Sequence, residues 1–275
     1  MVHFTANSGW TAAGAPPFVL TVHDVIFLER TRERRLRQQL GHRYWSWNLR
    51  RSAAAAAAVA SPSAAAAEAV ARALGLDEPP LVIPNGVDVP AAAAPPGAGD
   101  YAVAFAGRDP RKRLDLAIAG WRTAGWPREL HVLAAAGLPP DFEALAGDDV
   151  AAGRIRVVGR QSRADLDARV AGAAALVYPS EHEGFGLPVV EAMAAGTPVI
   201  TGLCAATREV AGDAALPIDG GDPVAAIGSG LRRLRDDPAL RERLAADGLE
   251  RARGYSWDSC ASAYVALYER AAAAA

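Results

Sequence analysis

Residues 180–200 decide the fold of this chain, and their sequence is SEHEGFGLPVVEAMAAGTPVI. The apolar run 175–178 before them predicts a buried strand that ends at a proline. Glycines on both sides of Phe185 allow a tight turn that can come close to a ligand. Residues 187–195 are typical of a helix with a proline in its first turn, and a new strand starts near residue 198. The stretch therefore predicts a strand, a glycine-rich loop, a helix and a second strand.

A helix that starts beyond such a loop presents free N–H groups at the carboxyl edge of a parallel sheet, and this arrangement suits phosphate. Glu183 lies on the loop and Glu191 on the helix, with seven residues between them. They are separated by about two helical turns, so both carboxylates can serve one pocket. The alternative is that both glutamates are solvated surface acids, and for an isolated Gly-x-Gly that interpretation would be favoured.

The ordered run resembles the signature of the family 4 retaining glycosyltransferases, the glycosyl transferases group 1 family. That signature has the pattern Pro-Ser-x-x-Glu-Gly-Phe-Gly-Leu-Pro-x-x-Glu-Ala-Met-Ala-x-Gly-x-Pro-Val-Ile, and Glu183 and Glu191 occupy its two glutamate positions. The resemblance covers nearly the whole chain in the right order. It implies the GT-B architecture, in which two Rossmann-like domains face each other across a cleft. Strands that alternate with helices also indicate an α/β class with parallel sheets.

Length and composition narrow the class of protein. A chain of 275 residues suits two modest domains or one large α/β domain. A net charge of −2 gives no general attraction to nucleic acid. Cys204 and Cys260 have no metal-binding or redox spacing, and no apolar run is long enough to span a membrane. We expect a cytoplasmic protein.

We expect four parts along the chain. They are a partial N-terminal, acceptor-side domain at 1–90, a linker at 91–100, a nucleotide-sugar-binding domain at 101–255 and a last helix at 256–275 that returns to the first domain. The alanine-rich stretch 53–60 resembles a strand of the family, although alanine is a weak strand former. Family members carry further β-α units and a glycine-rich loop before the point that this chain's start resembles. An incomplete first domain is therefore expected, from a misassigned start codon or a shortened form.

Candidate site residues follow the predicted strands. The strand 18–22 ends in His23 and Asp24, at the edge where open α/β sheets bind ligands. An aspartate that caps a helix beside an incidental histidine is the alternative. The resemblance implies that His23 lies near the transferred sugar.

The loop after the strand 101–106 carries clustered cations that could neutralise a diphosphate, or could simply be solvated. The resemblance implies that Arg108 and Lys112 contact the donor's phosphates, although this loop is shorter than usual. It also implies that the turn at Gly159 and Arg160 helps to hold the nucleotide base.

The expected activity is retaining, metal-independent hexosyl transfer from a nucleotide-diphosphate sugar to a glycan or lipid-linked acceptor, including mannosyl transfer in polysaccharide biosynthesis. Glu191 would accept from both ribose hydroxyls as a bidentate ligand, and the backbone of Gly184, Phe185, Gly186 and Leu187 would hold the sugar and pyrophosphate. Arg108 and Lys112 would stabilise the departing diphosphate, so that neither a cofactor nor a metal is required. Glu183 would stabilise an oxocarbenium-like transition state or, as a less favoured variant, act as a covalent nucleophile.

Two other interpretations stay open. A non-catalytic nucleotide-sugar-binding remnant, or a subunit that needs a partner, is consistent with a partial first domain. A GT-B sugar-nucleotide epimerase has the right fold but a different signature.

The segment Arg30–Arg51 is dense in arginine and contains Tyr44, Trp45 and Trp47. A solvated helix face is the favoured interpretation. The sharper hypothesis is peripheral contact with anionic lipid on the inner face of the membrane. RNA binding is less favoured, because no nucleic-acid module surrounds the segment.

Overall fold

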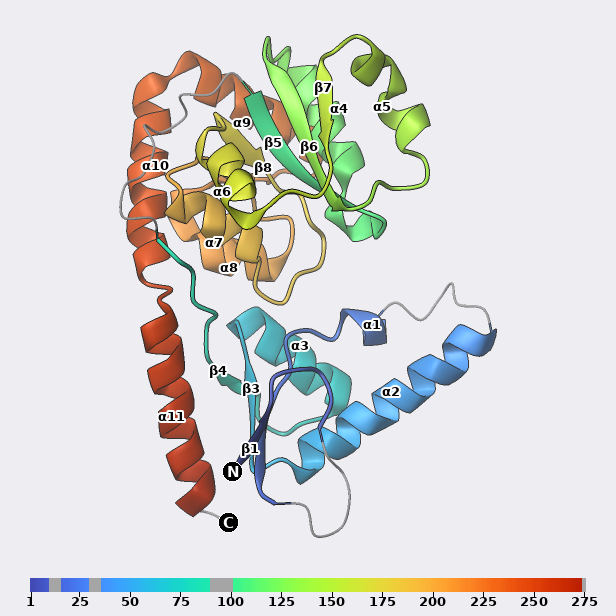
Figure 1. Ribbon diagram of the computed structural model, residues 1–275, viewed down its shortest axis with the longest axis vertical. Helices are drawn as coiled ribbons and strands as arrows, with labels where there is room; N and C mark the ends of the chain where they lie inside the picture. The colour runs from blue at the N-terminus through green and yellow to red at the C-terminus, as the bar shows by residue number, and fades with distance from the viewer. Residues whose placement is uncertain (10–15, 30–35, 90–100, 274–275) are drawn as a thin grey trace. The chain divides into compact units, whose positions relative to one another are not determined.

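The computed structural model describes residues 1–9, 16–29, 36–89 and 101–273 (Figure 1). The expected linker at 91–100 lies outside these residues. The chain divides into two compact units. The first comprises Met1–Gly86, Glu183–Phe185 and Ser256–Ala275, and the second comprises Val87–His182 and Gly186–Tyr255. Each unit is built on a parallel sheet with helices, so the predicted α/β class is confirmed.

The first unit contains a four-stranded parallel sheet in the order β1-β2-β3-β4. Its strands are β1 (Val2–Phe4), β2 (Phe18–Thr21), β3 (Ala58–Ser61) and β4 (Leu81–Val82). Its helices are α1 (Ile26–Glu29), α2 (Leu36–Ala55), α3 (Ala64–Leu74) and α11 (Trp257–Ala273). The order of the strands in the sheet follows their order in the chain.

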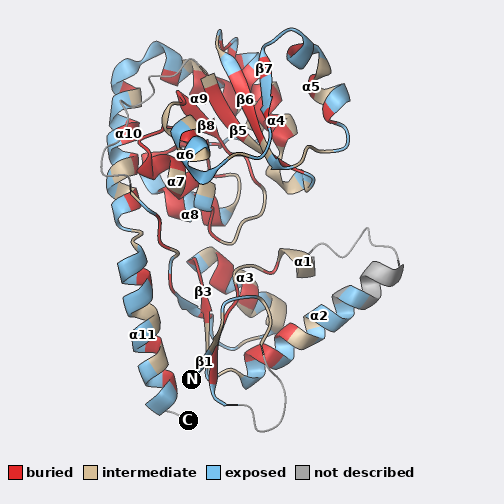
Figure 2. Ribbon diagram, in the orientation of Figure 1, coloured by how far each residue is buried: buried red, intermediate tan, exposed pale blue. Residues whose placement is uncertain are grey.

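Helices cover both faces of this sheet because the side chains of β2 alternate. Leu20 of β2 packs in one cluster with Leu49 of α2 and Val70 of α3. Val19, its neighbour in sequence, packs in a second cluster with Leu267 of α11. Full burial of such a side chain stabilises the fold by about 1.5–3 kcal/mol. Figure 2 shows α11 with buried positions at intervals between exposed ones.

Two segments of the first unit test the local sequence signals. Local signals set both ends of helix α3, because the hydroxyl of Ser63 accepts from Ala66 N–H at 3.0 Å and Gly75 ends the helix with φ +72°. The strand expected over 53–60 is only partly correct. Helix α2 continues to Ala55, and β3 begins at Ala58. Alanine favours helix over strand, which explains why α2 extends into this stretch.

The second unit contains a six-stranded parallel sheet in the order β10-β9-β8-β5-β6-β7. Its strands are β5 (Tyr101–Gly107), β6 (Glu129–Ala136), β7 (Ile155–Val158), β8 (Ala175–Val177), β9 (Val199–Thr201) and β10 (Leu216–Pro217). Its helices are η1 (Pro110–Lys112), α4 (Leu114–Ala124), α5 (Phe142–Ala151), α6 (Arg163–Ala171), α7 (Leu187–Ala194), α8 (Ala205–Ala211), η2 (Gly212–Ala214), α9 (Pro223–Asp236) and α10 (Pro238–Arg253).

The strand order of the second unit reverses beside β5. From β5 the chain moves outward through β6 to β7, and it then returns to place β8 on the other side of β5. In open α/β sheets, ligands bind beyond the carboxyl ends of the strands at such a reversal. The loops after β5 and β8 are therefore the expected location of a ligand.

Helices α4 and α9 pack closely together in the core of the second unit. A Cβ atom on Gly120 of α4 would lie 2.4 Å from Cγ2 of Ile227 in α9, so only glycine allows this contact. The apolar side chains of Ile227, Leu231 and Leu234 recur at helical spacing along α9, and all three are fully buried. Figure 2 shows the strands of this sheet as mostly buried.

A chain of hydrogen bonds joins α11 to the sheet of the first unit. A neutral His3 with its proton on Nε2 satisfies it: Nε2–H donates to Thr21 Oγ1 at 2.8 Å, and Nδ1 accepts from the Tyr268 hydroxyl at 2.6 Å. The Thr21 hydroxyl also lies 2.8 Å from the Tyr264 hydroxyl. Burial, together with the nearby His23, lowers the pKa of His3 below its ordinary value of 6.5.

This network predicts a pH dependence of stability. The folded state disfavours a charged His3, so the unfolded chain binds the proton first as the pH falls through about 6.5. Burial also lowers the pKa of His131, so both histidines contribute with the same sign. We expect the midpoint temperature of thermal unfolding to decrease as the pH is lowered from 7.5 to 5.5. In His3→Gln this decrease should be smaller. An unchanged pH slope in His3→Gln would contradict the assignment.

Candidate functional site

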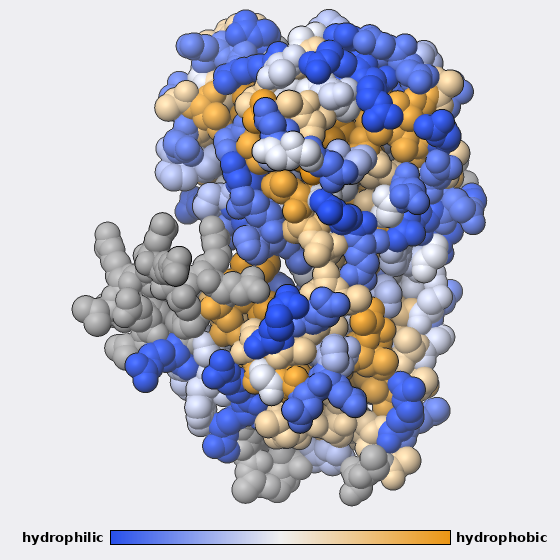
Figure 3. All heavy atoms as spheres, turned by 180° about the vertical axis from the view of Figure 1, so that it is seen from behind, coloured by the Kyte–Doolittle hydropathy of each residue, from blue (hydrophilic) through white to orange (hydrophobic). Residues whose placement is uncertain are grey.

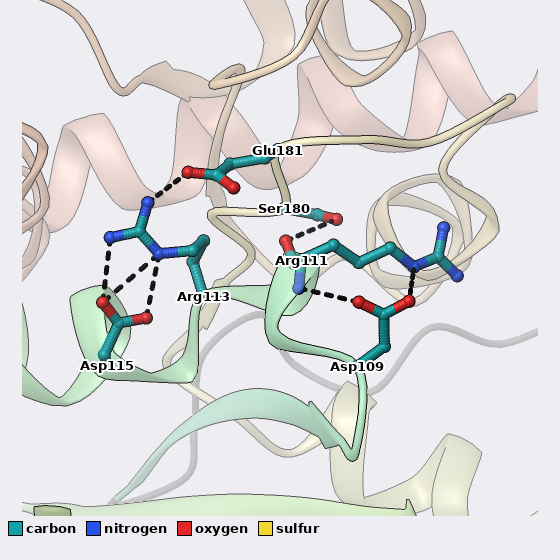
Figure 4. A network of polar contacts seen from close by, with 6 residues as sticks. All are labelled: Asp109, Arg111, Arg113, Asp115, Ser180 and Glu181. Carbon is teal, nitrogen blue, oxygen red and sulfur yellow. Dashed lines mark hydrogen bonds and ion pairs between the residues drawn. The ribbon is translucent and has the colours of Figure 1, made fainter. Parts of the chain in front are cut away.

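The loops that follow β5 and β8 are bonded to each other. Glu181 N–H donates to the carbonyl of Arg111 at 2.9 Å, and the Ser180 hydroxyl donates to the same carbonyl at 3.3 Å. In return, Nη1 of Arg111 donates to the carbonyl of His182 at 3.1 Å. Figure 4 shows Arg111 and Ser180 approaching each other from the two loops. The cationic loop and the signature loop therefore form one connected structure.

Asp109 fixes the shape of the cationic loop. Its Oδ1 accepts from Arg111 N–H at 3.0 Å at the start of η1, and its Oδ2 lies 3.5 Å from Nε of Arg111 (Figure 4). A carboxylate at the first turn of a helix satisfies N–H groups that have no partner within the helix. Arg111 is thus held by its own loop while it binds the other.

Arg113 is the one non-glycine residue with positive φ in the described parts of the chain, at 49°. This conformation costs on the order of 1–2 kcal/mol for an ordinary residue. Its guanidinium bonds to Asp115, at 2.9 Å from Oδ2, and to Glu181 of the signature loop (Figure 4). Hydrogen bonding to Asp115, and to a lesser degree to Glu181, raises the pKa of Arg113. The pair with Glu181 adds a second bridge between the loops.

Lys112 is directed at the end of β8. Its ammonium donates to the hydroxyl of Tyr178 and lies 4.8 Å from the centre of that ring. Lys112 is also the chain's one lysine, although lysine and arginine together number 29. A compact ammonium on a flexible stem differs from the planar guanidinium that this chain uses elsewhere. Tyr178, which the sequence marked only as a strand residue, is therefore part of the site.

Arg108 lies elsewhere on the same edge of the sheet. It is exposed, and its Nε would lie 3.2 Å from a Cβ on Gly137, in the loop after β6. Gly137 has φ +90° and leaves room for this side chain. The guanidinium of Arg108 therefore lies beside the loop after β6, near the carboxyl ends of β5 and β6.

A hollow of about 240 Å³ lies between the loops after β5 and β6. Ligand pockets usually measure about 300–1,000 Å³, so this hollow is too small for a whole nucleotide sugar. Its charged lining consists of Asp109, Lys112, Arg113, Asp115 and Asp141. Because the three aspartates outnumber the lysine and the arginine there, the hollow by itself is not a strong anion site.

Helix α7 begins directly at the signature loop. Gly186 caps it with φ +102°, a conformation that other residues rarely adopt, and a Cβ there would lie 3.1 Å from Cγ2 of Thr207. Pro188 occupies the first turn, and Leu187 is exposed. The helix therefore starts as the sequence predicts, with its N-terminus at the carboxyl edge of the sheet.

Glu191 has a partner that the sequence analysis did not identify. Oε1 of Glu191 accepts from Nη1 of Arg163 at 2.8 Å, and Nε of Arg163 donates to Asp167 at 3.0 Å. The role of Glu191 as a bidentate acceptor for ribose stays a prediction, and in this structure Oε1 is already engaged by Arg163. Arg163 thus bridges Asp167 of α6 and Glu191 of α7.

The remaining predicted residues are divided between the units. His23 belongs to the first unit, where its Nε2 lies 2.9 Å from the carbonyl of Thr5. Residues 183–185 are grouped with the same unit, and a Cβ on Gly184 would lie 1.8 Å from the carbonyl oxygen of His23. Glycine is thus required at 184, and Glu183 is adjacent to that contact. Gly159 and Arg160 follow β7, and Arg160 is exposed.

The described part of α2 carries exposed aromatic and basic side chains. They form what we call the aromatic–arginine patch: Arg43, Tyr44, Trp45, Trp47, Arg50 and Arg51. The rings of Tyr44 and Trp47 lie 6.2 Å apart, and Cζ of Arg51 lies 5.0 Å from the Trp47 ring. The side chains of 30–40, which include the other predicted arginines, lie outside the description.

Among the residues with described placement, no helix is long and apolar enough to cross a membrane, and no cluster of three His, Cys, Asp or Glu could hold a metal. On the face drawn in Figure 3, hydrophilic and hydrophobic residues are interspersed.

Comparison with known proteins identifies two family matches. Residues 102–251 match the family described as "Glycosyl transferases group 1", and residues 2–90 match "Glycosyltransferase Family 4". The chain is 35% identical over 159 residues to the O-antigen chain mannosyltransferase B of Escherichia coli, which covers 58% of this chain and 38% of that protein. The chain therefore spans well under two thirds of the curated relatives it matches.

Solved structures agree in fold. A sucrose-phosphate synthase from Thermosynechococcus elongatus superposes with a TM-score of 0.76 at 23% identity, covering 94% of this chain and 68% of that one. Anabaena HepE in complex with UDP-glucose gives a TM-score of 0.74 at 17% identity, covering 92% and 72%. The two parallel-sheet units thus have the GT-B fold.

Proposed function

Because this chain belongs to the glycosyl transferases group 1 family, we propose that it transfers a sugar from a nucleotide-diphosphate sugar to a hydroxyl acceptor with retention of configuration. The observation that carries the proposal is the joined pair of loops at the β5–β8 reversal. This junction brings Lys112 to the end of β8 and the N-terminus of α7 to the same edge of the sheet. Cations and free N–H groups at one edge suit a diphosphate leaving group.

The proposed reaction is a displacement on one face of the sugar. The bond from the anomeric carbon to the diphosphate breaks, the bond from that carbon to the acceptor oxygen forms on the same face, and the acceptor proton goes to the departing diphosphate. Lys112 and Arg108 would stabilise the charge that develops on the diphosphate. Such stabilisation by side chains is the reason to propose a reaction without a metal.

The other residues take supporting roles in this proposal. Gly159 and Arg160 would border the nucleotide base, and Glu191 would bind the ribose. Backbone groups of 184–187 would hold the sugar and pyrophosphate, and Glu183 would stabilise positive charge on the sugar ring. His23 would orient the sugar. The 35% identity to a protein named a mannosyltransferase favours mannose as the transferred sugar.

A non-catalytic nucleotide-sugar-binding protein, or a subunit that requires a partner, is the second candidate. Its support is the same junction of the loops after β5 and β8, which could hold a donor without turnover. Both candidates require the donor site in the second unit. They differ in turnover, which the enzyme would show in the presence of an acceptor and the binding protein would not.

The donor site predicts a thermal shift. We expect one class among UDP-, GDP- and ADP-sugars to raise the unfolding temperature, because a ligand at about 100 times its Kd stabilises the native state by about 2.7 kcal/mol. Glu191→Ala should remove the shift. Absence of a shift with all three classes in the wild-type chain would refute the donor site.

Lys112→Ala should lower kcat by about 10²-fold, by analogy with the loss of one electrostatic stabiliser. Lys112→Arg keeps the charge but replaces the compact ammonium, and we expect it to recover only part of the activity. Arg253→Gln is a control, because Arg253 is exposed on α10 and pairs with Glu250. Wild-type turnover in Lys112→Ala would exclude the proposed role.

We also propose that the aromatic–arginine patch contacts anionic lipid on the cytoplasmic face of a membrane, where a lipid-linked acceptor would be available. Helix α2 contains four arginines and no acidic residue. Arginines near an anionic surface contribute about 1 kcal/mol each, and tryptophan and tyrosine favour the interface. The whole chain has a net charge of −2, so the attraction to anionic lipid would come from the arginines of α2 and not from the charge of the chain as a whole.

Vesicle flotation tests this contact. We expect binding to vesicles that contain phosphatidylglycerol and little binding to pure phosphatidylcholine. Arg50→Gln with Arg51→Gln should weaken the binding by roughly tenfold or more. The matched pair Arg243→Gln with Arg253→Gln, exposed on α10, should leave it unchanged. Equal loss from both pairs would point to net charge and contradict a specific patch.

A further inference from the structure

Arg163 holds the Glu191 carboxylate from one side. It is the first residue of α6, and its guanidinium uses separate nitrogens for separate partners. Nη1 donates to Oε1 of Glu191 at 2.8 Å, while Nε donates to Asp167 at 3.0 Å. Asp167 lies one turn further along α6, so it keeps the guanidinium in place independently of Glu191.

The other oxygen of Glu191 remains available. Across the described ranges, no residue donates to Oε2, and the side chain retains 25% of its exposure. An ionised carboxylate accepts at both oxygens, so Oε1 can stay with Arg163 while Oε2 accepts from a ligand. Hydrogen bonding to Glu191, followed by that to Asp167, raises the pKa of Arg163, which therefore stays charged.

We infer that Arg163 is a positioning residue of the donor site, which orients Glu191 so that Oε2 accepts from the ribose hydroxyls. The inference rests on the proposed function, because it assigns a nucleoside diphosphate to the site. Asp167 supports the arrangement from the far side. Glu191 then binds ribose through one oxygen, and the carboxylate is fixed before the ligand arrives.

The opposite role is that Arg163 competes with the ribose for Glu191. A competitor would have to leave when the ligand binds, and the separate bond to Asp167 opposes that movement. The two roles predict opposite signs for the effect of removing the guanidinium. An exposed ion pair contributes little to folding stability, so the effect should appear in ligand affinity and not in the unfolding temperature.

Isothermal titration with UDP, GDP and ADP, each beside its 2′,3′-dideoxy counterpart, tests the inference. For the nucleotide that the wild-type chain binds, Arg163→Gln should weaken affinity by about five- to tenfold, since a pre-ordered side chain no longer meets the ligand. The dideoxy nucleotide should bind both chains equally. Asp167→Asn should give a smaller loss with the same dependence on the hydroxyls, and Arg163→Lys should restore part of the affinity.

Arg253→Gln is the matched control, because Arg253 is 59% exposed, against 60% for Arg163, and also pairs with a glutamate. It should leave both affinities unchanged. An equal loss for the ribose and dideoxy nucleotides would place Arg163 in contact with another part of the ligand and overturn the inference. Unchanged or tighter binding in Arg163→Gln would overturn it as well. Failure of the wild-type chain to bind any of the three nucleotides would overturn the proposed function together with this inference.

Discussion

The hydrogen bond between Glu181 N–H and the carbonyl of Arg111 is the constraint on which the arrangement of the site depends. It joins two loops that lie about 70 residues apart in the chain, and it exists because β5 and β8 are neighbours in the sheet. Arg111, Ser180 and the Arg113–Glu181 ion pair reinforce the same junction. The junction ties the backbone beside Lys112 to the signature loop, in addition to the contact of Lys112 with Tyr178. The order of the strands in the sheet therefore determines which side chains meet at the site.

Elements that are defined by signals over a few residues could be predicted from the sequence. Helix α3 is defined by Ser63 at one end and Gly75 at the other, and α7 follows from a glycine, a proline and an apolar face. Helix α5 could not be predicted in this way, because its sequence FEALAGDDVA combines a glycine with two adjacent aspartates and shows a weak periodicity. The boundary between α2 and β3 falls in a run of alanines, where local propensity does not mark a change of structure.

The candidate site was predictable where it consists of a motif, and not where it depends on contacts across elements. Glu191 stands out in the signature, but its partner Arg163 lies on another helix. Arginine is so frequent in this chain that a single arginine does not indicate a site residue. Tyr178 reads as the last apolar residue of a strand, although its hydroxyl binds Lys112. There was a further reason in the sequence to single out Lys112 as a candidate site residue. It is the one lysine in a chain that otherwise uses arginine, and an ammonium differs from a guanidinium in shape and hydration.

Helix α11 comes last in the sequence, yet it covers one face of a sheet whose strands β1 to β4 come first. During synthesis on the ribosome, that face has no cover until residues 257–273 have left the exit tunnel. The second unit has all its strands and helices between residues 101 and 253 and can complete its own core earlier. The sheet of the first unit is therefore completed only after the whole second unit has been made, and the face that α11 covers stays open in that interval.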